Sequence, residues 1–206
     1  LKKENAVLNS VELSNTHVQV ILADTAEAPK DTVETALNWR IALHSLKLKN
    51  VSVDLQMPLD SMTLAANIGD ASIEDANADL KRQFYGWRKF ALTGTAVNYD
   101  SGTAAPVEGF DASHIALRDI RIGIDSVMSC GRDMNVVIRE FSMYDRSGLT
   151  VTSLTGRLFA DSTLIRVPHL QLTTPHSEMN LTAQTYWKLV DIPTTGRLSA
   201  RFNANI

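Results

Sequence analysis

The chain has 206 residues, of which 44% are hydrophobic and 21% charged, a composition typical of a folded protein and not of a disordered one. The formal net charge of -3 gives no general attraction to nucleic acid, so we expect no nucleic-acid partner. The single cysteine, Cys130, excludes a disulfide framework, and no apolar run approaches the roughly 18 residues of a membrane-spanning helix.

The first patterned stretch, VELSNTHVQVIL at 11–22, alternates apolar and polar residues but slips by one residue near its middle. Val11 and Leu13 share one phase, whereas Val18 and Val20 share the other. Successive side chains of a strand point to opposite faces, so a slip turns half of the apolar residues outward unless the backbone absorbs it. We predict a strand with a local irregularity here.

A short helix is predicted over 29–40, PKDTVETALNWR. Pro29 and Asp31 provide start and cap signals, and Val33, Ala36 and Leu37 lie at helical spacing.

The slip recurs in LKLKNVSVDL at 46–55 and in IALRDIRIGI at 115–124. Asn15, Asn50 and Asp119 occupy the same place beside it in the three copies, whose starts lie 35 and 69 residues apart. Asn and Asp tolerate left-handed backbone geometry. The recurrence therefore predicts a weak internal repeat in which a β-bulge or a tight corner keeps one apolar face continuous.

The stretch 73–87 is compatible with helix or strand, and its β-prone Phe84 and Tyr85 favour strand. Basic residues cluster at the end of this stretch and just beyond it, with Phe84, Tyr85 and Trp87 between them, and we interpret the cluster as part of a polar strand face or a turn: Lys81, Arg82, Arg88 and Lys89. Six further stretches alternate and are separated by turn signals: 90–99, 134–144, 149–159, 163–172, 178–187 and 196–206. The sequence thus predicts an all-β protein with at most one or two short helices.

No motif for catalysis or metal binding is found. The chain has no Gly-rich phosphate loop, no nucleophile elbow and no paired Cys-x-x-Cys. His169 and His176 are seven residues apart, which fits no common metal-ligand spacing, and Asp75 and Asp79 are interpreted as part of a solvated face. We predict that the protein is not an enzyme and needs no cofactor.

Several stretches resemble strand units of the AsmA-like superfamily, and of its TamB branch of the Bacteroidota type in particular. WRIALHSLKLKNVSVDL, GFDASHIALRDIRIGIDSV, IREFSMYDRSGLTVTSLTGRLF and VPHLQLTTPHSEMNLTAQ carry the likeness, which covers roughly residues 35 to 190. The resemblance implies an elongated, curved, antiparallel-rich half-pipe with an apolar concave face. It also implies a role in phospholipid transport and outer-membrane biogenesis.

The resemblance further implies a periplasmic location in a diderm bacterium. The parent protein would be anchored in the inner membrane, and an outer-membrane barrel partner would bind parts of it outside this segment. We expect residues 1–206 to form a single elongated β-domain, an internal segment of a larger protein, with possible sub-units 1–105 and 106–206.

Phospholipid acyl chains are the predicted ligand, and ten apolar residues flanking two of the slips are the candidate groove residues. They are Leu46, Leu48, Val51, Val53, Leu55, Ile115, Leu117, Ile120, Ile122 and Ile124. From the pattern alone, the same residues are equally suited to the closed core of a β-sandwich. The alternative functions are a surface or periplasmic β-sandwich binding module, of adhesin or glycan-binding type, and a β-solenoid enzyme.

Overall fold

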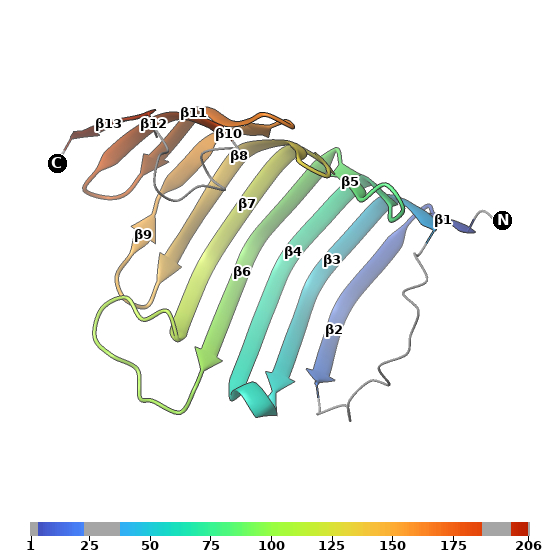
Figure 1. Cartoon of the computed structure of the whole chain (residues 1–206). Helices are drawn as coiled ribbons and strands as arrows, with labels where there is room; N and C mark the ends of the chain where they lie inside the picture. Colours follow the sequence, from blue (N-terminus) through green and yellow to red (C-terminus); the bar gives the residue numbers. More distant parts are fainter. Residues whose placement is uncertain (1–3, 23–37, 187–198, 206) are drawn as a thin grey trace.

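The computed structural model of the chain describes residues 4–22, 38–186 and 199–205. As predicted, the protein is all-β, and the strands of these residues belong to one sheet. Within the same residues the helical structure is limited to η1, a 3-10 turn at Pro58–Asp60. Figure 1 shows β1 and β13 at opposite edges of the sheet.

The first half of the sheet is built mainly from long strands. It consists of β1 (Glu4–Leu8), β2 (Val11–Ile21), β3 (Trp39–Met57), β4 (Met62–Asp79), β5 (Phe84–Trp87), β6 (Lys89–Ser101) and β7 (His114–Cys130). β1 and β2 follow one another along the same side of β3 and pair with it in parallel, each residue facing the residue 35 positions later. β5 and β6 likewise lie in one line, interrupted at Arg88, along β4.

The second half consists of shorter antiparallel strands. They are β8 (Asp133–Asp145), β9 (Thr150–Val151), β10 (Ser153–Ala160), β11 (Leu164–Thr173), β12 (Glu178–Tyr186) and β13 (Ser199–Asn205). Their connections are short turns with the expected chemistry. Between β10 and β11 the carboxylate of Asp161 accepts the backbone N–H groups of Thr163 and Leu164 at 2.7 and 2.9 Å.

These bounds confirm the predicted strands and resolve one ambiguous stretch. Residues 73–87 complete β4, turn at Leu80–Gln83 and continue as β5. Most of the helix predicted over 29–40 lies outside the described residues, and its last two positions, Trp39 and Arg40, begin β3.

The repeated slip is a backbone corner. Asn15, Asn50 and Asp119 all have left-handed backbone geometry, with φ of 51°, 52° and 52°, and Gly94 in β6 has φ of 59°. Between β2 and β3, and between β3 and β4, the pairing register continues unchanged past the corner, so no extra residue is inserted there. Register shifts begin farther on, between β6 and β7 and between β7 and β8, and they recur between β10 and β11 and between β11 and β12.

Candidate functional site

The ten predicted residues lie on one face of the sheet, which we call the apolar face. Directly paired residues of neighbouring strands place their side chains on the same face. Val53 pairs with Ala66, Ala66 with Val97, and Val97 with Leu117, so this row joins β3 to β7 without leaving the face. Three further rows between β3 and β7 run in the same way, whereas at the corner the polar Thr95 of β6 is the residue that pairs with Ile120.

β4 and β6 lie between β3 and β7, the two strands that carry the ten predicted residues, and none of the residues of β4 and β6 was predicted to line the groove. They contribute Leu64, Ala66, Ile68, Ala71 and Ile73 from β4, and Phe90, Leu92, Val97 and Tyr99 from β6. The alternation of 90–99 in the sequence already pointed to the β6 residues. The β4 residues include small alanines, and only the register set by the η1 turn assigns them to this face.

The apolar face continues into the second half of the sheet. One row crosses nine strands and contains Val11, Leu46, Ile73, Phe90, Ile124, Ile138, Gly156, Leu170 and Leu181. At Gly156 the side chain of Leu170 occupies the place of the missing Cβ, since an added Cβ would lie 2.7 Å from Leu170 Cδ1. The row therefore contains no polar side chain from β2 to β12.

The sheet bends toward this face along the line of corners. Asn15, Asn50, Gly94 and Asp119 are all exposed. The residues that follow three of them, Val51, Thr95 and Ile120, are only 3%, 3% and 5% exposed. No second layer of described residues covers Val51 or Ile120, so the bent sheet itself must enclose them. The corner residues thus lie on the convex side, and the apolar face is concave along this line.

Close backbone approach on the same line requires a glycine in β4. A Cβ at Gly69 would lie 2.8 Å from the backbone oxygen of Gly94 and 2.9 Å from that of Thr93. Contacts below 3.0 Å between a Cβ and a backbone atom force one strand away from the other. Gly69 is therefore needed for β4 and β6 to cross the bend side by side.

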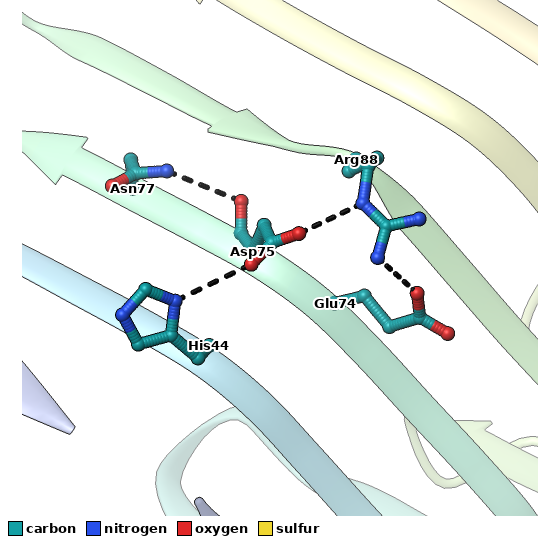
Figure 2. Close-up of polar contacts among 5 residues, drawn as sticks. All are labelled: His44, Glu74, Asp75, Asn77 and Arg88. Carbon is teal, nitrogen blue, oxygen red and sulfur yellow. Dashed lines mark hydrogen bonds and ion pairs between the residues drawn. The ribbon is translucent and has the colours of Figure 1, made fainter. Parts of the chain in front are cut away.

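A second irregularity lies at Asp75, which is also left-handed, with φ of 51°. Figure 2 shows its carboxylate between His44 of β3 and Arg88, at 3.3 Å from His44 Nδ1 and 2.8 Å from Arg88 Nε. Arg88 also binds Glu74, and the backbone oxygen of Asp75 accepts a hydrogen bond from Asn77. The hydrogen bonds from Arg88 and then His44 hold the pKa of Asp75 below its ordinary value.

Asp79 is held in a similar way at the end of β4. Its carboxylate binds Arg40 Nε at 3.0 Å and accepts the backbone N–H of Arg82. Burial, which raises the pKa, is outweighed by this N–H and by the charges of the two arginines, so the pKa of Asp79 is lowered. A general acid at neutral pH needs a raised carboxyl pKa. The lowered pKa values of Asp75 and Asp79 do not fit that role, and two arginines of the predicted basic cluster, Arg82 and Arg88, are among their partners.

The apolar face is not a closed core in the described part of the chain. Only four hydrophobic residues there are buried, Val51, Ile120, Val151 and Ala160, and no large side chain is fully buried. A β-sandwich of this size would bury many large side chains between two sheets. The described sheet instead leaves most of its apolar side chains half-exposed.

The described residues form neither a metal site nor a membrane-spanning helix. They contain no group of three His, Cys, Asp or Glu side chains that could hold a metal ion, and His169 and His176 are both exposed. None of their helical structure has the length and apolar character needed to span a membrane. No family model, curated protein or solved structure matches this chain.

Proposed function

We propose that this chain is a non-catalytic β-scaffold segment whose apolar concave face holds the acyl chains of phospholipids. The proposal includes the setting implied by the TamB/AsmA resemblance. In it, the segment belongs to an envelope protein of a diderm bacterium that is anchored in the inner membrane, and it shelters lipid in the periplasm during outer-membrane biogenesis. The barrel partner of such a protein would contact parts outside this segment.

The observation that carries the proposal is the continuous apolar face, which no second layer of described residues covers. Exposed apolar surface in contact with water is unfavourable by about 25 cal/mol per Å². A face that extends over most strands of a sheet therefore favours an apolar ligand or partner. The bend toward the face adds shape, because a concave surface contacts an acyl chain on more than one side.

The length of the apolar face is also sufficient for an acyl chain. The row of nine residues from Val11 to Leu181 crosses eight strand-to-strand spacings, or about 38 Å at roughly 4.8 Å each. The hydrocarbon core of a bilayer is about 30 Å thick and contains two opposed acyl chains. An acyl chain lying along such a row would contact apolar side chains along its whole length.

The test compares two pairs of aspartate variants in the purified chain. Val53→Asp and Ile122→Asp place a charge on the apolar face, whereas Lys47→Asp and Arg121→Asp place it on exposed positions of the same strands. Phospholipid that co-purifies with the chain is measured by native mass spectrometry and by phosphorus assay, and circular dichroism checks the fold. We expect both apolar-face variants to lose most of the bound lipid and both controls to retain it.

Two results would count against the proposal. One is a folded wild-type chain that retains no lipid after mild extraction from membranes. The other is a chain whose apolar face is covered by a second copy, detected as a dimer that the Val53→Asp variant dissociates. In that case the alternative hypothesis of a binding module would be favoured.

A further inference from the structure

A second surface suited to a specific partner is the free edge formed by β1 and β2. β3 pairs with one side of this line, and no described strand pairs with the other. Large apolar side chains are exposed along it: Val7, Leu8, Val20, Ile21 and Leu22. Natural sheets usually protect an edge with charges, prolines or bulges, because its unpaired N–H and C=O groups bind other strands. This edge carries little such protection.

The pairing of β2 with β3 shows which strand the edge fits. In both strands apolar residues lie four and two positions before an Asn and one, three and five positions after it. The one exception is Thr16 of β2, which directly follows Asn15. The two corner residues lie opposite one another, and Asn50 Nδ2 donates to Asn15 Oδ1 at 2.8 Å. Asn15 Nδ2 has no partner among the described residues. A further strand with the same spacing would accept the equivalent hydrogen bond.

The direction of that strand follows from the pattern itself: apolar residues lie at even distances before the corner residue and at odd distances after it. In parallel, all the apolar residues of two such strands fall on one face. In antiparallel alignment at the corner, Leu13 would lie beside a residue equivalent to His17, which belongs to the polar face. β7 illustrates the conflict, because it runs against β6 with its own left-handed corner at Asp119, and the register shifts on both of its sides.

We propose that the β1–β2 edge binds a parallel β-strand of the same repeat pattern, with the partner's Asn accepting a hydrogen bond from Asn15. Because the apolar spacing differs before and after the corner residue, a second copy of this chain is a poor occupant of the edge. A two-fold axis would pair β2 with its copy in antiparallel orientation, and the two corners would no longer coincide without a shift. This proposal does not depend on lipid binding.

The probe is a fluorescent peptide with the sequence of residues 46–57, LKLKNVSVDLQM, added to the whole chain carrying Cys130→Ser. Fluorescence anisotropy measures binding. Deleting the Asn from the peptide restores a regular alternation and removes the corner, and we expect it to abolish binding. Asn15→Gly in the chain keeps the left-handed backbone but removes the amide, and we expect about fivefold weaker binding, the effect of one hydrogen bond.

Disulfide trapping then determines the direction. With Gln19→Cys in the chain, we expect cross-linking to a peptide with Cys in place of Asp54, the residue that faces Gln19 in the β2–β3 register. An antiparallel strand aligned at the corner would instead cross-link through the position of Leu46.

Any of four results would overturn the proposal: no binding, equal binding of the Asn-deleted peptide, cross-linking at the Leu46 position, or a dimer of the chain linked through Gln19→Cys. Lipid retention by the Asn15→Gly variant is measured in parallel. Because Asn15 lies on the convex side, unchanged lipid retention is expected, so that failure of either proposal can be recognised independently of the other.

Discussion

The two halves of the sheet achieve the same continuous apolar face by different means. From β2 to β7 the strands have 11 to 19 residues, apart from the short β5, and bend at aligned corners with left-handed residues in β2, β3, β6 and β7. From β8 to β12 the longest strand has 13 residues, and no described residue inside those strands has positive φ. The register there shifts instead, between Arg157 and Phe159 and between Val167 and Leu170.

The difference shows that curvature can be specified residue by residue or left to irregular pairing. A left-handed Asn, Asp or Gly fixes the position of a bend in its own strand, and alignment across strands turns the separate bends into one line. In the second half, Pro168 lies within a register shift, where its missing N–H removes no ladder hydrogen bond. We therefore expect the first half to be sensitive to the corner residues and the second half to tolerate changes of pairing.

The largest expected effect is at the close approach of β4 and β6. Gly69→Ala places a Cβ against two backbone oxygens, and we expect a loss of about 3 kcal/mol in the free energy of unfolding, as for severe overpacking. Gly156→Ala creates a similar contact in the second half, 2.7 Å from the backbone oxygen of His169. The adjacent register shift lets β10 and β11 separate, so we expect a smaller loss of about 2 kcal/mol.

Urea unfolding followed by circular dichroism measures both losses. Gly102→Ala is the control, because nothing lies within 4 Å of its added Cβ and only its positive φ of 83° is strained, at a cost of about 1 kcal/mol. Equal losses at all three glycines would mean that close strand contact has no special role at the bend.

The next effect concerns the corner itself. Asn50→Val replaces a residue that tolerates left-handed geometry by a β-branched one and removes the hydrogen bond to Asn15, so we expect a loss of about 2–3 kcal/mol. Asn50→Gly removes only the hydrogen bond, and we expect about 1 kcal/mol.

The matched control is Asn180→Val in β12. Asn180 lies in an ordinary extended strand, where valine is favoured, so its replacement is expected to change the stability by less than about 0.5 kcal/mol. If Asn50→Val is as harmless as Asn180→Val in the same urea experiment, the corner does not depend on its left-handed residue.

The same contrast explains what the sequence could predict. The slip beside Asn15, Asn50 and Asp119 was visible because the bend is encoded in one residue, and the structure confirms left-handed geometry at all three. The parallel pairing of β2 with β3 was not predicted, although the 35-residue spacing of the repeat equals the offset of that register. Gly69 was missed because its requirement comes from the neighbouring strand and leaves no trace in its own phase pattern.

The smallest expected effect concerns acidic residues in the two halves. Asp75 is held by Arg88 and His44, whereas Asp161 in the second half is held mainly by backbone N–H groups, and the pKa of each is lowered. Because the folded-state pKa lies below the unfolded value of 3.8, each carboxylate stabilises the fold above that pH and loses its contribution as the pH falls through the folded-state pKa. We therefore expect Asp75→Asn and Asp161→Asn each to weaken the fold at neutral pH and to make acid unfolding less steep.

Salt distinguishes the two kinds of partner. At about 1 M salt the Debye length falls to roughly 3 Å, so the exposed ion pair of Asp75 is largely screened, while short hydrogen bonds to backbone N–H groups persist. We expect the stability difference between wild type and Asp75→Asn at neutral pH to shrink in high salt, and that between wild type and Asp161→Asn to remain. If both differences shrink equally, both carboxylates act mainly through charge. The turn at Asp161 in the second half would then depend on charge, as the irregularity at Asp75 in the first half does.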